Sequence, residues 1–92
     1  MEFEWDRAKA ASNLAKHGID FDDAIGVFDD PRMLSIVDPR SYGEMRYHAI
    51  GAVEGRVLFV VYTKRSSEVF RIITARKASR RERTAYTLQT RN

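Results

Sequence analysis

One short basic segment, residues 76–83, holds the side chains best suited to chemistry. It carries five cationic side chains and one carboxylate, Glu82, in eight residues. The run Ser79-Arg80-Arg81-Glu82 fits a capping box, so a helix is expected to begin at Ser79. Because free amides at a helix start and guanidinium groups both bind anions, the segment predicts a site for a phosphate ester. The alternative is that these arginines are solvated or paired with the acidic first half of the chain.

Two other residues of this helix, Arg81 and Tyr86, can be placed relative to its faces. Arg81 is expected near the buried side of the helix, because it shares a helical stripe with Ala78, Ala85 and Leu88. Tyr86 follows Glu82 by one turn, so the two side chains can meet on one face. Such a pair could act as an acid/base couple or form a simple hydrogen bond on the helix surface.

A second set of polar side chains falls on predicted strands. Arg46 and His48 project from the same face of one strand, and Arg71 of another strand joins them if the register allows. Half-buried strands also carry solvent-facing Arg and His residues that have no role. These three residues therefore indicate a basic face without fixing its chemistry.

Length and composition exclude several classes of protein. At 92 residues, with 43% hydrophobic and 32% charged residues, the chain is expected to form one globular domain, residues 1–92. The lack of cysteine excludes disulfides and thiol chemistry, and two separated histidines do not indicate a metal site, so no cofactor is expected. No apolar run approaches the roughly 20 residues of a membrane-spanning helix. The acidic start lacks the features of a signal peptide, so a cytoplasmic protein is expected.

The charge is divided between two halves of the chain. Residues 1–46 hold six Lys and Arg against ten Asp and Glu, a net charge of −4, and residues 47–92 hold ten against three, a net of +7. A basic half of this kind is typical of proteins that bind a polyanion or an acidic partner, and a solvated surface is the alternative. A chain this short has a thin core, so a partner or an oligomer is expected to support its stability.

The first part of the chain is expected to be helical. Phe3-Glu4-Trp5 alternates and fits a short strand. Asp6 then fits the N-cap of a helix over residues 7–16, and Gly18 fits the left-handed residue that follows it. The apolar stripe of this helix is expected to be buried, and it consists of Ala8, Ala11, Leu14 and Ala15.

The polar face of the same helix carries three residues spaced by four, Lys9, Asn13 and His17. His17, at the end of the helix, is interpreted as a cap for free carbonyls rather than as a catalyst. A second helix over residues 22–28 is expected to bury Ile25 and Phe28 and to end at Asp30-Pro31.

Four strands are expected to follow, over residues 33–37, 44–53, 56–63 and 69–76. Residues 38–43 have the composition of a loop, and Glu54-Gly55 fits a tight turn. The third of these strands is apolar on both faces, which places it centrally in the sheet. In the last strand, one face is expected to carry Phe70, Ile72 and Thr74, and the other Val69, Arg71, Ile73 and Ala75.

The closing helix is expected over residues 79–88, with a tail over residues 89–92 that frays. The order of elements predicts an α+β fold. In it, N-terminal helices pack on an antiparallel four-stranded sheet, with a helix at the C-terminus.

Two separated motifs resemble the signatures of the BrnT family of bacterial toxins. The first runs from Phe3-Glu4-Trp5-Asp6 through Lys9, Asn13 and Lys16-His17-Gly18-Ile19 to Phe21. The second covers residues 71–83, Arg-Ile-Ile-Thr-Ala-Arg-Lys-Ala-Ser-Arg-Arg-Glu-Arg, and is followed by Tyr86. Together they span nearly the whole chain in order, whereas residues 33–43 match only loosely.

The resemblance implies a RelE-like fold and a ribonuclease toxin of a type II toxin–antitoxin pair, which degrades mRNA and arrests growth. It also implies a BrnA-type antitoxin that holds the toxin inactive, with operator DNA contacted only through the antitoxin. The antitoxin is expected to cover the basic face, because this would both neutralise its charge and block RNA.

Cleavage of RNA without a metal uses the 2′-hydroxyl as the nucleophile on the neighbouring phosphate. The enzyme must move two protons and stabilise charge on the phosphate oxygens. We expect Arg76 and Arg80 to stabilise that charge, and Glu82 and Tyr86 to move protons, with His48 a further candidate. A structural role for Glu82 in the capping box competes with a role as base. RNA is expected to be positioned by Arg46, His48, Arg71, Lys77, Arg81 and Arg83.

Two other functions stay open at this point. The chain can be a binding module for nucleic acid or protein that performs no turnover. It can also be a degenerate toxin that acts only as the structural partner in an autorepressing complex.

Overall fold

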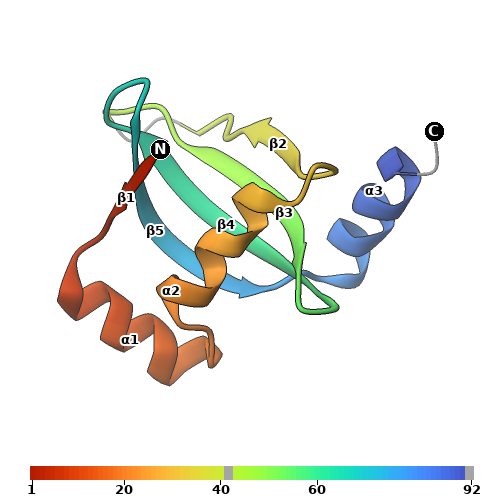
Figure 1. The fold of residues 1–92 in the computed structure, drawn as a ribbon, viewed down its shortest axis with the longest axis horizontal. Helices are drawn as coiled ribbons and strands as arrows, with labels where there is room; N and C mark the ends of the chain where they lie inside the picture. Colours follow the sequence, from red (N-terminus) through yellow and green to blue (C-terminus); the bar gives the residue numbers. More distant parts are fainter. Residues whose placement is uncertain (41–42, 91–92) are drawn as a thin grey trace.

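The computed structural model describes residues 1–40 and 43–90. Two residues of the predicted loop, Ser41 and Tyr42, and the end of the predicted tail, Arg91 and Asn92, lie outside the described residues. The elements, in chain order (Figure 1), are β1 (Glu2–Glu4), α1 (Arg7–His17), α2 (Phe21–Ala24), the 3-10 helix η1 (Ile25–Asp29), β2 (Leu34–Val37), β3 (Tyr47–Val53), β4 (Arg56–Lys64), β5 (Val69–Lys77) and α3 (Arg80–Thr90).

The strands form one sheet with the order β1-β5-β4-β3-β2. Strands β2 to β5 are an antiparallel meander, as the sequence predicts, and β4 is central. The short strand β1 pairs in parallel with residues 69–71 at the start of β5, which makes five strands rather than four. The α+β class with N-terminal helices and a C-terminal helix is confirmed.

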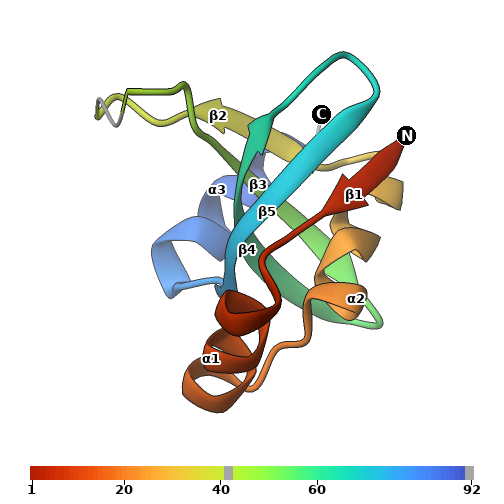
Figure 2. The same ribbon diagram turned by 90° about the vertical axis from the view of Figure 1, so that its left-hand side faces the viewer.

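The helices lie on different sides of the sheet (Figure 2). Helix α2 and η1 cover one face, and α3 lies on the other side, against β3. The core lies under α2 and η1, where Phe21, Ala24 and Val27 pack against apolar residues of the sheet that include Leu58, Val60, Tyr62 and Ile72. Gly51 allows this approach, because a Cβ there would lie 3.0 Å from Val27 Cβ and 3.1 Å from its carbonyl oxygen.

The caps and turns that the sequence predicts at the ends of the elements are present in the structure. The Asp6 carboxylate accepts a hydrogen bond from the Lys9 N–H (3.0 Å) at the start of α1. Gly18, with φ of 71°, ends this helix and donates its N–H to the carbonyl of Leu14, so the helix cap is this glycine. The turn at Glu54 and Gly55 has φ of 51° and 80°, as a two-residue hairpin turn requires.

The buried side of α1 is not the one that its apolar stripe predicts. Ala8, Ala11, Leu14 and Ala15 are all exposed, and the prediction was wrong. The buried residue is Asn13, from the face predicted to be polar. Its side-chain amide donates to the carbonyls of Ala75 (2.8 Å) and Ile19 (3.0 Å) and accepts from the Ala75 N–H (3.1 Å). Because β1 pairs only with the first part of β5, these bonds satisfy the open edge of β5 further along.

A bulge in β5 changes which of its residues face the core. Tyr62 pairs with Ile72 and the preceding Val61 pairs with Thr74, so Ile73 is an extra residue. Ile72 and Ala75 are therefore both buried in the core, and Thr74 is exposed. The predicted alternation fails beyond Ile72, because a single inserted residue reverses the faces of the residues that follow.

The second predicted helix is present as two short pieces. Helix α2 covers only residues 21–24, and η1 continues the chain to Asp29. Ile25 and Phe28 are half-buried and pack against the core, whereas Phe21, Ala24 and Val27 are fully buried. The closing helix begins after Ser79, as predicted, but extends to Thr90, two residues beyond the predicted end at residue 88.

Candidate active site on the outer face of the sheet

The face of the sheet opposite α2 carries a row of polar side chains. The register places His48 beside Val61 and Val61 beside Thr74, and it pairs Phe59 with Arg76 and Thr63 with Arg71. We call this surface the outer face; its polar and aromatic members are Arg46, His48, Phe59, Thr63, Arg71, Thr74 and Arg76. The register thus brings Arg71 to the same face as Arg46 and His48.

A buried carboxylate holds the histidine of the outer face. Asp38 is 5% exposed, and its Oδ2 lies 2.9 Å from Nε2 of His48. Hydrogen bonds from the side chain and backbone of Arg40, and from His48, hold the pKa of Asp38 well below its usual range despite the opposing effect of burial. Asp38 therefore remains ionised and favours a proton on Nε2, which leaves Nδ1 as the basic nitrogen.

An aromatic ring joins His48 to Arg76. The rings of His48 and Phe59 lie 4.8 Å apart, and the Arg76 guanidinium carbon lies 4.1 Å from the Phe59 ring centroid. The cation over the ring adds a cation–π attraction to the packing. An imidazole base and a guanidinium therefore lie against the same ring, on neighbouring parts of one surface.

Glu82 binds Arg76 in a two-point ion pair. The distances from Nη1 and Nη2 of Arg76 to the two carboxylate oxygens are 2.8 and 2.9 Å. The same carboxylate accepts the Ser79 N–H (2.8 Å), while the Ser79 hydroxyl accepts the Glu82 N–H, so the capping box is present. Burial acts to raise the pKa of Glu82. The hydrogen bonds from Arg76 and Ser79 lower this pKa by more than burial raises it, so the net shift is downward. An ionised carboxylate with three donors is better suited to hold Arg76 than to remove a proton.

The other arginines of the outer face are also paired. Arg71 donates to Glu4 at 2.7 Å, which fits the alternative that basic residues pair with the acidic first half. Arg46 lies 3.4 Å from Glu44. These ion pairs fix the guanidinium groups on the surface instead of leaving them splayed into solvent.

The remaining predicted site residues lie on α3 or at the end of β5. Arg81 is exposed, so its predicted place near the buried side was wrong; the less exposed side of α3 is formed instead by Glu82, Ala85 and Tyr86. Lys77 is exposed, and Arg83 donates to the carbonyl of Ala78. Arg80 and Arg83 line a separate hollow with Val57, Thr84, Thr87 and Leu88.

Tyr86 is held by a residue of a different element. Its hydroxyl donates to Asp30 at the end of η1, and the same carboxylate oxygen accepts the N–H of Ala52 in β3 (2.8 Å). Its hydrogen bond with Asp30 raises the pKa of Tyr86, which keeps the hydroxyl protonated. Tyr86 therefore ties α3 to the sheet and does not meet Glu82 in an acid/base pair.

Sequence reasoning did not select Asp38 or Phe59 for this site. Asp38 lies in the segment with the composition of a loop. The signal that could have marked it is an acidic residue two positions beyond Ile36, which pairs with His48 in the β2–β3 hairpin. No local pattern marks Phe59, because its role comes from the pairing of β4 with β5. Within residues 1–40 and 43–90, no three His, Cys, Asp or Glu side chains are grouped so that they could hold a metal ion. Over the same residues, no helix is long and apolar enough to cross a membrane.

Comparison with known proteins assigns the family. The family model described as the BrnT ribonuclease toxin of type II toxin–antitoxin systems matches residues 5–82. The chain belongs to this family. The BrnT match includes Asp38, His48, Arg76 and Glu82 and ends before Tyr86.

A solved structure supports the BrnT assignment. The crystal structure of the Brucella abortus ribonuclease toxin BrnT is 33% identical to this chain, with a TM-score of 0.67. The similarity covers 87% of this chain and 99% of the Brucella protein. Among curated proteins, none matches the chain. As a BrnT protein, the chain is a ribonuclease toxin whose system includes an antitoxin.

Proposed function

We propose that this BrnT chain cleaves mRNA on the outer face by attack of a ribose 2′-hydroxyl on the neighbouring phosphate, without a metal ion. The observation that supports this most is the buried, ionised Asp38 on Nε2 of His48, with Arg76 beside it across Phe59. A carboxylate that orients an imidazole is the arrangement by which histidine acts as a general base.

Each group has a defined role in this proposal. Nδ1 of His48 removes the proton of the 2′-hydroxyl, whose oxygen then bonds to phosphorus. The bond from phosphorus to the 5′-oxygen breaks, and the leaving oxygen takes a proton from water. The products are a 2′,3′-cyclic phosphate and a 5′-hydroxyl. Arg76 stabilises the charge on the phosphate oxygens, because a guanidinium stays charged and donates two hydrogen bonds.

Four further residues support the cluster. Glu82 positions Arg76, and Arg46 and Arg71 bind the RNA in the neighbouring row of the outer face, on the side of His48 away from Arg76. Arg80 stands at the start of α3, where it can contact a phosphate beyond the scissile one. In this arrangement His48 replaces Glu82 and Tyr86 as the group that moves a proton.

We further propose that a BrnA-type antitoxin covers the outer face in the cytoplasm and that operator DNA is bound only through the antitoxin. The positive second half of the chain supports this, because an acidic partner would gain electrostatic complementarity there. Release of the toxin would expose the outer face and arrest growth through loss of mRNA.

The experiment compares purified wild-type protein with His48→Gln on a labelled RNA, in the presence of EDTA. We expect cleavage by the wild type, cyclic phosphate ends, and a loss of at least about a hundredfold in the variant. An RNA with a single 2′-deoxy substitution at the cut should resist cleavage there. Cleavage that survives this substitution, or that requires a divalent ion, contradicts the proposal.

One observation favours a second function, a binding module without turnover. Arg40, Arg46, Arg71 and Arg76 each pair with a carboxylate, so their charges are partly neutralised before any RNA arrives. Under this alternative the protein binds RNA with a steep dependence on salt but never cuts it, even when ribosomes are present. The same assay therefore separates the two functions.

A further inference from the structure

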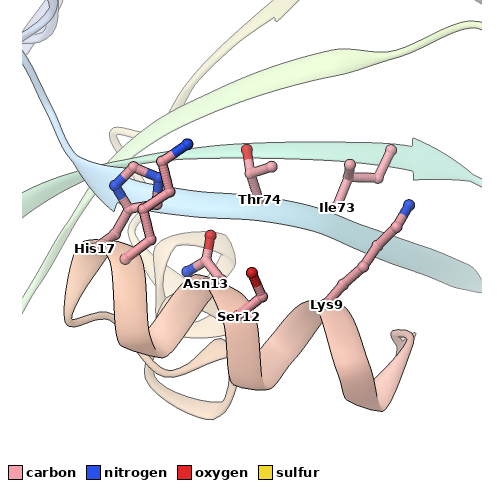
Figure 3. A pocket seen from close by; sticks show the side chains of 7 residues that line it. Lys9, Ser12, Asn13, His17, Ile73 and Thr74 are labelled. Carbon is pink, nitrogen blue, oxygen red and sulfur yellow. The ribbon is translucent and has the colours of Figure 1, made fainter.

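A groove between α1 and β5 presents cations in a different way from the outer face (Figure 3). It has a volume of about 270 Å³ and is lined by Lys9, Ser12, Asn13, Lys16, His17, Ile73 and Thr74. Figure 3 shows Lys9 and His17 rising from the two ends of the helix, with Thr74 and Ile73 on the strand opposite. Except for Ile73, every side chain that lines the groove can donate a hydrogen bond.

The groove is a consequence of the bulge in β5. The extra residue Ile73 turns Thr74 outward, and the side chain of Asn13 holds the next residue, Ala75, by two hydrogen bonds. Asn13 is thereby fully used and forms the floor of the groove. Lys9, Ser12 and Lys16 follow one another at helical spacing, so they share the side of α1 that faces the groove.

Among the described residues, the two lysines of the groove have no ion-pair partner. Across residues 1–40 and 43–90, neither Lys9, Lys16 nor His17 has a carboxylate oxygen within 4.0 Å, in contrast to Arg71 and Arg76. The charge of Lys9 does act on Asp6. The pKa of Asp6 is lowered, mainly by the hydrogen bond from the backbone N–H of Lys9 and to a lesser degree by the charge of the Lys9 side chain. Two ammonium groups without ion pairs, beside hydroxyl donors, suit a phosphate group.

The groove is continuous with the outer face. Thr74 lines the groove, and it lies in the same row across the sheet as Val61 and His48. Because neighbouring strands are about 4.8 Å apart, Thr74 lies about 10 Å from His48. An RNA strand that places one phosphate at His48 can therefore reach the groove with a phosphate two or more nucleotides further along the strand.

We propose that this groove is a phosphate subsite, which binds a phosphate of the RNA strand two or more nucleotides from the one that is cut. The subsite rests on the proposed function, since it takes its ligand from the strand that lies at His48. Lys9 and Lys16 supply the charge, and Ser12 and Thr74 supply hydrogen bonds to the phosphate oxygens. The groove adds affinity and sets the direction of the strand, whereas the outer face performs the reaction.

The test measures binding of a fluorescent eight-nucleotide RNA that is 2′-O-methylated throughout and so cannot be cut. We expect the double variant Lys9→Gln with Lys16→Gln to bind about tenfold more weakly than the wild type. The slope of log affinity against log salt should fall by about 0.7 for each phosphate that the variant no longer binds. The matched control, Arg32→Gln with Arg56→Gln, removes two charges outside the groove and the outer face and should bind within about twofold of the wild type.

If the groove variant and the control variant bind the RNA probe with equal affinity, the proposal is overturned. This holds even if the groove variant binds its antitoxin more weakly. Thermal unfolding of both variants shows whether either loss comes from misfolding. The outcome is distinct from failure of the proposed function, because the probe reports binding alone. If wild-type protein never cuts RNA but only the groove variant loses affinity, the subsite stands and the proposed reaction fails.

Discussion

The outer face and the groove bear similar charges but hold them differently. Each arginine of the outer face is fixed by a carboxylate, and His48 is fixed by a buried one. The lysines of the groove stand on one face of a helix without an ion pair among the described residues. A reaction requires groups held in one geometry, whereas a phosphate can be bound by mobile ammonium groups. This difference is what supports the two proposals, that the outer face performs the reaction and that the groove binds a phosphate.

The largest effect is expected from replacing Asp38, and it tests whether the outer face performs the reaction while the groove binds a phosphate. Asp38→Asn keeps the size of the side chain but removes the charge that orients His48, so the turnover number should fall by about a hundredfold to ten-thousandfold. The affinity for the methylated RNA probe should stay within about threefold, because the groove is intact.

Steady-state kinetics and probe binding give the two values for the Asp38 variant. Asp23→Asn is the matched control, because Asp23 is exposed and lies outside the site. If Asp38→Asn lowers the affinity for the RNA probe as much as it lowers turnover, the reaction and the binding of RNA are not assigned to separate surfaces as proposed.

A smaller effect is expected from Asn13, which joins the groove to the core. Asn13→Ala removes three hydrogen bonds and leaves the buried backbone groups of Ala75 without partners. The free energy of unfolding should fall by about 2–4 kcal/mol. Urea unfolding measures the change, with Ser12→Ala as a control expected to stay within about 0.5 kcal/mol. An equal effect of the two variants would show that Asn13 does not hold the bulge.

The smallest effect is the response of stability to acid. The pKa values of Asp38 and Glu82 lie below their ordinary values, so these carboxylates stabilise the fold above their unfolded pKa. This stability should be lost as the pH falls from about 5 through the lower folded pKa values. Thermal unfolding between pH 7 and pH 2 should therefore show a loss that is smaller in Asp38→Asn.

The groove variant supplies the contrast for the acid experiment. Lys9 and Lys16 form no ion pair with a described carboxylate, and the charge of Lys9 is only a minor cause of the lowered pKa of Asp6, so their replacement by Gln should change the acid loss much less than Asp38→Asn does. An acid loss in the groove variant as shallow as that of Asp38→Asn would mean that the lysines are coupled to carboxylates as strongly as the outer face is.

The ends of the elements could be predicted from sequence because their bonds are local. Asp6 caps α1 through a residue three positions away, and Ser79 and Glu82 cap α3 over the same span. The turn at Gly55 needs only a residue that tolerates a positive φ. The apolar run of β4 likewise identified the central strand.

The sequence by itself determined the α+β class, the caps, the turns, the family resemblance and the basic second half. The tertiary structure alone decided that Asn13 is buried and that β5 bulges at Ile73. It also decided that Asp38 contacts His48 and that the Tyr86 hydroxyl donates a hydrogen bond to Asp30. Each of these depends on a partner outside the residue's own element, 62 residues away in the bonds of Asn13 to Ala75, 56 in the bond of Tyr86 to Asp30 and 10 in the contact of Asp38 with His48. Helical and strand periodicity describes only neighbours within one element, so it cannot show which backbone group of another element needs a hydrogen bond.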